Sequence, residues 1–234
     1  MTNPVIPMSE RGEERTPAQV FLQPVAAPSI LGLYGFAGAT FMVAANMAHW
    51  FGNPTTTALF LAPFAAMFGG LAQFLAGMWA FKARDGLATA MHGTWGSFWL
   101  GYGILSILFA TGTLAAPKGA FQALGFWFIV LAAITWAGTY AAAAEVKAVA
   151  WVLGWLAAGS TAAAVGNLTG AEWVNILAGW LFIISAIIAW YTASALMLES
   201  AYGRPVWPLG KTVRMKELPK VMIGTGEPGV IRGQ

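Results

Sequence analysis

The chain has 234 residues, of which 58% are hydrophobic and only 9% are charged, and its mean hydropathy is +0.66. About a quarter of the residues of an ordinary soluble domain are charged, so this composition excludes a soluble protein and indicates an integral membrane protein. The net charge of +3 comes from basic residues in predicted loops and tails, without the pattern of a nucleic-acid surface, and the absence of cysteine excludes disulfides and thiol chemistry.

The chain begins with a polar segment and continues with six apolar ones. Residues 1–28 are rich in proline and charge and lack the apolar core of a signal peptide, so we expect a disordered cytoplasmic tail there. Each apolar segment is long enough for a hydrocarbon core, which takes about 20 helical residues, and none alternates as a barrel strand does. The predicted fold class is therefore all-α and polytopic, with a membrane domain over residues 29–200 and a second cytoplasmic tail over 201–234. The six predicted transmembrane helices span residues 30–50, 58–81, 87–110, 120–144, 148–167 and 173–198.

Basic residues are distributed unequally between the two sides of the predicted bundle. The loops on one side carry only Lys118, whereas the tails and the loops on the other side carry all the remaining basic residues. The positive-inside rule therefore predicts that both termini face the cytoplasm, in a multi-pass protein of the plasma or inner membrane. The basic side carries Arg11, Arg15, Lys82, Arg84, Lys147, Arg204, Lys211, Arg214, Lys216, Lys220 and Arg232.

Glycines recur at helical spacing in the first three segments, among them Gly35, Gly69, Gly77, Gly93 and Gly96. Membrane helices associate through close backbone packing, because lipid provides no hydrophobic force between them. We therefore expect most of these glycines to lie at helix contacts.

Helical spacing also groups bulky and hydrogen-bonding side chains on three predicted helix faces. In a narrow path, such faces could hold a small polar solute through hydroxyls and amides and then make it cross an apolar constriction. The amides of Gln73 and Asn167 cannot satisfy all their hydrogen-bonding positions locally, whereas serine and threonine hydroxyls can bond to carbonyls of their own helix. The three faces carry Phe36 with Thr40, His92 with Trp95 and Trp99, and Leu156 with Ser160 and Asn167.

Short motifs occur in a defined order between residues 28 and 210. They are LGLYGF, FGGLAQFLAG, GSFW, GN, LAGW and YGRPVWPLG, and as an ordered set they resemble the acetate uptake transporter family, also called GPR/FUN34/YaaH. The resemblance implies a six-helix protomer with one central pore, a homohexamer in the lipid bilayer, and passage of acetate or succinate by a channel-like route or together with protons. It implies a transport protein rather than an enzyme, without a cofactor, a metal site or a nucleic-acid partner.

The resemblance also implies roles for individual residues, matched motif by motif. Three bulky side chains are implied to narrow the pore: Phe36, which closes LGLYGF, Trp95, which precedes GSFW, and Leu156 in the fifth segment. Gln73 matches the polar position of GG-x-x-Q and Asn167 that of GN, so both are implied to lie on the solute path.

The chain departs from the family pattern at three places. The string APSI at 27–30 replaces Asn-Pro-Ala-Pro, Trp95 replaces a tyrosine, and His92 stands where an apolar aromatic residue is expected. Trp95 adds bulk and removes a phenolic hydroxyl, which predicts a tighter constriction or a different solute.

The stretch MHGTWGSFWLGYG, residues 91–103, is predicted to be the pore-lining side of the third segment. Ser97 is expected to offer a hydrogen-bond donor near the constriction. His92 has two alternatives. It could present a cation to a carboxylate in acid, which would make transport sensitive to pH, or bond as a neutral ring to a carbonyl of another helix.

No acidic residue lies inside a predicted span, so an obvious carboxylate for proton coupling is missing. Because a bare carboxylate is costly in an apolar medium, the solute either carries its own proton as the undissociated acid or passes as the anion with help from amides and hydroxyls.

Two other functions are compatible with part of this pattern. A channel for a small neutral solute, such as an amide, urea or ammonia, fits the same polar and apolar lining. A heme-binding redox subunit would use His49 and His92, but these lie near opposite ends of their segments, and the chain has no nucleophile and base pair at depth that would indicate an enzyme.

Overall fold

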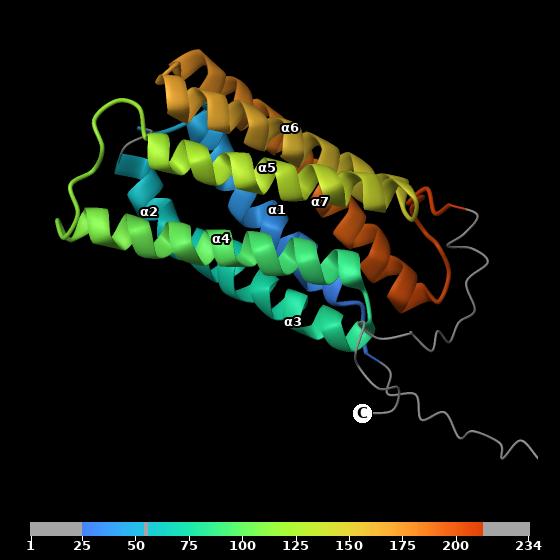
Figure 1. Cartoon of the computed structure of the whole chain (residues 1–234). Helices are drawn as coiled ribbons and strands as arrows, with labels where there is room; N and C mark the ends of the chain where they lie inside the picture. Colours follow the sequence, from blue (N-terminus) through green and yellow to red (C-terminus); the bar gives the residue numbers. More distant parts are fainter. Residues whose placement is uncertain (1–24, 54–55, 213–234) are drawn as a thin grey trace, which may run out of the picture.

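The computed structural model describes residues 25–53 and 56–212, and the regular structure within these residues is helical (Figure 1). Helices cover all six segments predicted to cross a membrane, which confirms the all-α fold class. The second segment is one continuous rod of three parts, α2 Thr56–Ala65, the π-helix η2 Ala66–Ala72 and α3 Gln73–Ala83. The other rods are α1 Pro28–Met47, α4 Gly86–Ala110, α5 Gln122–Ala143, α6 Lys147–Thr169 and α7 Glu172–Tyr202.

Within the described residues, five of these rods are long and apolar enough to cross a membrane, namely α1, the rod of α2, η2 and α3, α5, α6 and α7. α4 is not among them, although its 25 residues suffice in length. Its sequence contains His92, hydroxyl side chains and several glycines, which lower its hydropathy. The stretch predicted to line a path thus lies on a rod that does not meet both criteria for a membrane span.

The rods form a ring in which each packs on the next (Figure 1). α5 packs on α6, α6 on α7, and α7 on α1. α1 packs on the rod of α2, η2 and α3, and this rod packs on α4. α4 touches α5 along a shorter stretch and closes the ring.

Glycines allow α3 and α4 to touch backbone to backbone. A Cβ added at Gly77 would lie 2.6 Å from the backbone nitrogen of Gly93, and one added at Gly96 would lie 2.6 Å from that of Phe74. No larger side chain fits at either place without a shift of the backbone. The prediction that glycines lie at helix contacts is confirmed here.

The π-helix η2 places two more glycines where bulk is excluded. A Cβ at Gly69 would lie 2.6 Å from Cδ1 of Trp99, and one at Gly35 would clash with the carbonyl oxygen of Phe68. Such wide turns inside α-helices are rare and are frequent at functional sites. In this ring, η2 lets the indole of Trp99 pack against the backbone of the neighbouring rod.

Residues 203–212, here called the C-terminal strap, fold back from the end of α7 onto the turn between α5 and α6 (Figure 1). The backbone nitrogen of Ala148 donates to the carbonyl of Leu209 at 3.0 Å, and that of Lys147 donates to Gly210 at 3.1 Å. The strap therefore satisfies N–H groups that the first turn of α6 leaves free. α7 ends at Tyr202, close to the predicted start of the second tail at residue 201, and residues 1–24 and 213–234 of the two predicted tails lie outside the described residues.

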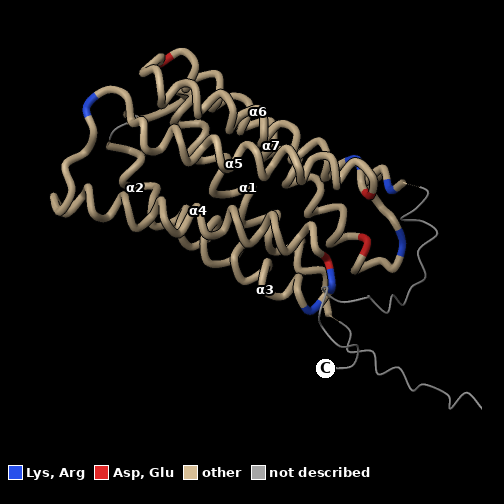
Figure 2. Tube along the Cα trace, viewed as in Figure 1, with Lys and Arg blue, Asp and Glu red and all other residues tan. Residues whose placement is uncertain are grey.

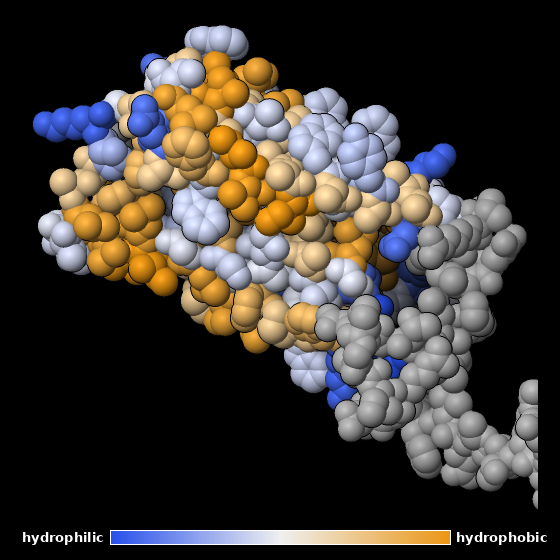
Figure 3. Space-filling view, in the orientation of Figure 1, coloured by the Kyte–Doolittle hydropathy of each residue, from blue (hydrophilic) through white to orange (hydrophobic). Residues whose placement is uncertain are grey.

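Charged residues gather at the two ends of the ring (Figure 2). Lys118 lies alone among the described basic residues at the end where α4 leads to α5, whereas the others lie at the opposite end. The visible side of the body between the ends carries many apolar side chains (Figure 3). Large exposed examples include Phe60, Phe126 and Trp127, as expected of a surface that faces lipid.

Candidate functional site

Two cavities lie within the ring, one toward each end. The first, of about 370 Å³, is here called the asparagine cavity because Asn46, Asn167 and Asn175 contribute to its wall. The second, of about 260 Å³, is here called the His92 cavity and lies toward the end that carries the C-terminal strap. Each cavity is lined by residues of α1, α4, α5, α6 and α7.

Phe36, Trp95 and Leu156, here called the closure, belong to one buried cluster, and each is only 2% exposed. The rings of Phe36 and Trp95 meet edge to face with centroids 6.4 Å apart. Trp95 and Leu156 also form part of the wall of the asparagine cavity. The structure thus brings together three side chains that are far apart in the sequence.

The order of lining residues along α1 and α4 places the closure between the two cavities. On α1, Leu33 lines the His92 cavity and Thr40 lines the asparagine cavity, with Phe36 between them. On α4, His92 and Trp99 line the two cavities in the same way, on either side of the closure. At a rise of 1.5 Å per residue, each pair is separated by about 10 Å along its helix.

The indole N–H of Trp95 is used inside the protein. Nε1 donates to Oγ1 of Thr135 on α5 at 3.1 Å, and Thr135 Oγ1 in turn donates to the carbonyl of Leu131 at 2.6 Å. Thr135 is fully buried. The closure therefore presents only apolar surface from its aromatic and aliphatic side chains.

Gln73 lies in the wall of the ring near the depth of the closure. Its backbone nitrogen would lie 3.5 Å from a Cβ at Gly35, the residue before Phe36. The side chain is 2% exposed, and its Oε1 has no hydrogen-bond partner in the described part of the chain. An unused acceptor is therefore buried at this depth.

Two amides of the asparagine cavity bond to backbone carbonyls. Asn46 Nδ2 donates to Phe51 O and Asn167 Nδ2 donates to Ala163 O, both at 2.8 Å. For Asn167, the bond runs within its own helix, so local geometry does satisfy part of this amide. Neither bond crosses the cavity.

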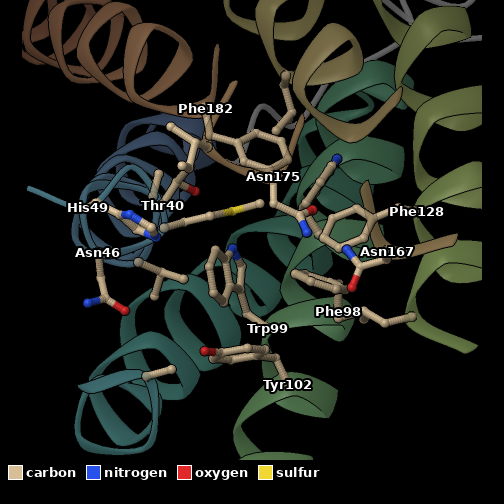
Figure 4. Close-up of a pocket in the computed structure, with 18 of the residues that line it drawn as sticks. Thr40, Asn46, His49, Phe98, Trp99, Tyr102, Phe128, Asn167, Asn175 and Phe182 are labelled. Atoms are coloured by element: carbon tan, nitrogen blue, oxygen red, sulfur yellow. The ribbon is translucent and has the colours of Figure 1, made fainter. Parts of the chain in front are cut away.

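Three other polar atoms in residues of this wall are buried without a partner in the described residues: Thr40 Oγ1, Trp99 Nε1 and Asn175 Oδ1. Figure 4 shows these side chains around one open space, with the Trp99 indole facing the side from which Asn175 enters. The amide of Asn175 fits because Gly166 has no Cβ, which would clash with its Oδ1. The wall thus contains hydrogen-bonding groups that no described residue uses, and the three atoms themselves are buried behind the cavity surface.

His92 is 5% exposed and packs on the backbone of α1. A Cβ at Gly32 would lie 2.5 Å from both Cε1 and Nδ1 of the imidazole. Nδ1 has no hydrogen-bond partner in the described residues, so the alternative in which this nitrogen bonds to a carbonyl of another helix is not observed.

Both acidic and basic groups line the outer part of the His92 cavity, among them Asp85, Glu145 and Lys211. Asp85 Oδ1 caps α4 by accepting from the backbone nitrogen of Ala88 at 2.8 Å. Lys211 Nζ pairs with Glu199 Oε1 at 2.6 Å. Among the residues that the structure describes, this wall therefore carries no excess of positive charge that would attract an anion.

Two residues predicted on the path lie elsewhere. Ser97 is on the exposed side of α4 and donates to Gly93 O of its own helix, because a residue two positions after Trp95 points to a different side. Ser160 is fully buried and donates to Leu156 O, also within its own helix. Neither side chain lines a cavity.

Asn175 and Thr135 were not predicted as site residues. Asn175 is a polar residue inside an apolar segment, and that signal was available in the sequence. Thr135 resembles any other helical threonine, and only its position opposite Trp95 in the fold reveals a role.

The two histidines lie on opposite sides of the closure. His49 lines the asparagine cavity, where its Nε2 is 3.6 Å from Glu172 Oε1, whereas His92 lines the other cavity. They cannot ligate one heme iron in this arrangement, so the redox alternative is not supported. Residues 25–53 and 56–212 also contain no group of three or more side chains suited to hold a metal ion.

Comparisons with known proteins agree on one family. The model of the GPR1/FUN34/yaaH family matches residues 13–209. The succinate-acetate/proton symporter SatP of Escherichia coli K12 is 29% identical over 190 residues, which cover 80% of this chain and 97% of that protein. The ammonia transport outward protein 2 of Saccharomyces cerevisiae is 30% identical over 174 residues, which cover 73% of this chain and 61% of that protein. The solved structure of the bacterial acetate channel SatP is similar with a TM-score of 0.73 at 25% identity, covering 80% of this chain and 100% of that one.

Proposed function

Because the chain belongs to the GPR1/FUN34/yaaH family, we propose that it transports acetate and similar small carboxylic acids across a membrane, through the two cavities and the closure between them. One observation carries the proposal: cavities enter the ring from both ends, and the buried apolar side chains of the closure lie between them. The similarity to a succinate-acetate/proton symporter and to an acetate channel supports this choice of substrate.

The proposed substrate form is the undissociated acid. The closure offers no free donor to a carboxylate, because the indole N–H of Trp95 is bonded to Thr135. Transfer of a bare carboxylate into such surroundings would be far more costly than transfer of a neutral carboxyl group. The proton would then travel with the solute, so that transport is linked to protons without an acidic residue in the path.

Unused polar groups support a route for a molecule that both donates and accepts hydrogen bonds. In the asparagine cavity, Thr40 and Trp99 would donate to the carboxyl group. At the depth of the closure, the free Oε1 of Gln73 would accept its O–H. Asn167 would form part of the wall of the asparagine cavity, and His92 would form part of the wall of the His92 cavity.

We propose that the His92 cavity opens to the cytoplasm. The described basic residues other than Lys118 lie at its end of the ring, as the positive-inside rule requires of a cytoplasmic side (Figure 2). This orientation places the asparagine cavity outside and both termini inside, in the plasma or inner membrane. The test is labelling of Lys118→Cys by a membrane-impermeant maleimide in intact cells, because the chain itself contains no cysteine. Labelling would support this orientation, and its failure in intact cells but not in broken ones would contradict it.

We also propose a homohexamer, on the family resemblance alone. The exposed apolar side chains of the ring, such as Phe126 and Trp127, suit contact with lipid or with another copy. Native mass spectrometry from detergent would support the proposal with a sixfold mass, and a monomer or dimer would contradict it.

The proposed transport is tested with purified protein in liposomes. Preloaded unlabelled acid should drive counterflow of labelled acetate, and protein-free liposomes give the background. A panel of short carboxylic acids and of their amides defines the substrate class. Counterflow that does not exceed the background for every acid would refute the proposal.

A small neutral solute is the second candidate. The similarity to an ammonia transport outward protein favours it, and the apolar closure would pass a neutral molecule of suitable size. The same liposome panel separates the two. Acetamide or ammonia flux without acetate counterflow would favour the neutral solute.

A further inference from the structure

Thr135 makes a hydrogen bond to the closure from a neighbouring helix. Trp95 Nε1 on α4 donates to its Oγ1 at 3.1 Å, and both residues are buried. Thr135 Oγ1 donates its own hydrogen to Leu131 O at 2.6 Å, which leaves a lone pair of this oxygen for the indole. The two bonds form a chain from the closure to the backbone of α5.

These two hydrogen bonds link α4 to α5, the neighbouring pair of rods with the shortest contact in the ring. α5 packs chiefly on α6 and touches α4 less. On either side of the bond, Phe98 of α4 meets Phe128 of α5 with ring centroids 5.6 Å apart, and Met91 of α4 packs against Gly138 of α5. A buried indole N–H without an acceptor is costly, so the bond favours the ring orientation in which Nε1 points to α5. In that orientation the indole turns its apolar part toward Phe36, the neighbouring residue of the closure.

We propose that Thr135 is a positioning residue for transport: its hydroxyl holds Trp95 across the path and thereby sets the size of solute that the closure admits. The proposal rests on the proposed function, because it gives a role in selectivity to a residue behind the closure. Thr135 itself touches neither cavity.

Thr139 provides a matched control on the same helix. Its Oγ1 donates to Thr135 O at 2.8 Å and has no bond to α4 in the described residues. A threonine-to-valine change removes a hydroxyl and keeps the shape at both positions. Only the change at residue 135 removes the acceptor of the indole N–H.

The test is the ratio of butyrate to acetate flux in liposomes. Thr135→Val should change this ratio by roughly fivefold, the size expected when one buried hydrogen bond is lost at the barrier. Thr135→Ser, which keeps the acceptor, and Thr139→Val should keep the wild-type ratio. In a Trp95→Phe background, which has no N–H to position, Thr135→Val should cause no further change. An unchanged ratio in Thr135→Val, or an equal change in the Trp95→Phe background, would overturn the proposal.

A second readout does not depend on transport. The ¹⁵N–¹H resonance of the Trp95 indole, assigned by its loss in Trp95→Phe, should shift in Thr135→Val and stay in place in Thr139→Val. If Thr135→Val does not fold, Thr135→Ala removes the same acceptor with a smaller side chain. A resonance that stays in place refutes the positioning, whereas a shifted resonance in a protein that transports no carboxylic acid refutes the proposed function alone.

Discussion

Replacement of Trp95 by alanine tests whether the closure is the barrier to transport. Trp95 is 2% exposed and meets Phe36 and Phe98 edge to face, with ring centroids 6.4 and 5.4 Å away. Because it already forms part of the wall of the asparagine cavity, its removal extends that cavity toward His92, which lies one turn away on α4. The two cavities then approach each other or merge.

The size of the effect follows from the polar group that must cross. A carboxyl group that enters an unhydrated apolar closure loses hydrogen bonds worth roughly 1–3 kcal/mol on scales from protein mutations. If water follows the acid through the widened closure, the barrier falls by a similar amount, and uptake rises by about 5- to 150-fold. Deletion of a buried aromatic side chain also lowers the free energy of unfolding by about 3–5 kcal/mol, so the flux must be measured well below the melting temperature of the variant.

The assay is initial uptake of labelled acetate and of longer acids into proteoliposomes. Trp127→Ala is the control, because Trp127 is 63% exposed on the outer surface of α5 and its loss leaves the closure intact. Trp95→Ala should raise uptake and admit longer acids, and Trp127→Ala should do neither. Unchanged flux and unchanged chain-length preference in folded Trp95→Ala protein would refute the reasoning.

Other substitutions test separate parts of the molecule. Gln73→Leu removes the free acceptor near the closure and should lower acetate uptake severalfold while the protein still folds; wild-type rates would remove Gln73 from the path. His92→Phe should keep the rise of uptake toward low pH, because the solute and not the protein carries the proton, and a flat profile between pH 5 and 8 would assign the titration to His92. Tyr191→Phe removes the bond from its hydroxyl to Pro208 O, at 2.8 Å, and should lower the free energy of unfolding by ~1 kcal/mol, whereas Tyr140→Phe, at a site 76% exposed, should not. Equal thermal stability of the two tyrosine variants would show that this bond does not hold the strap.

The helix faces could be predicted from the sequence because helical periodicity decides which side chains of one helix point the same way. Phe36 with Thr40 and His92 with Trp95 and Trp99 are each buried together, as their spacing implies. The acceptor of the Trp95 indole could not be predicted, because Thr135 lies 40 positions away in the sequence and meets Trp95 only when α4 and α5 pack together. The Ser160 hydroxyl donates to a carbonyl of its own helix, the local bond that is open to any helical serine.

The C-terminal strap shows a second limit of hydropathy. A window long enough to detect a membrane helix averages over about 20 residues, so a ten-residue segment between a helix and a basic tail is grouped with the tail. Packing of Trp207 on Tyr191, with nearly parallel rings at 5.4 Å, and the bonds of Leu209 and Gly210 to the start of α6 depend on tertiary structure. The motif YGRPVWPLG indicates the family by resemblance, but it does not indicate the shape of this segment.

A transport protein of this kind needs no buried acid to be linked to protons. The charged side chains of the described helices lie at or near helix ends, and the closure between the cavities is apolar. A solute carboxyl group with a pKa near 4.3, like that of a glutamate side chain, is undissociated in about one molecule in 500 at pH 7 and in about one in six at pH 5. If only this form crosses the closure, uptake from a fixed total concentration should rise by roughly 80-fold over these two pH units, with wild-type protein and with His92→Phe alike. Uptake that does not change between pH 7 and pH 5 would instead require passage of the anion, and the unused donors of Thr40 and Trp99 would then be the groups that lower its cost.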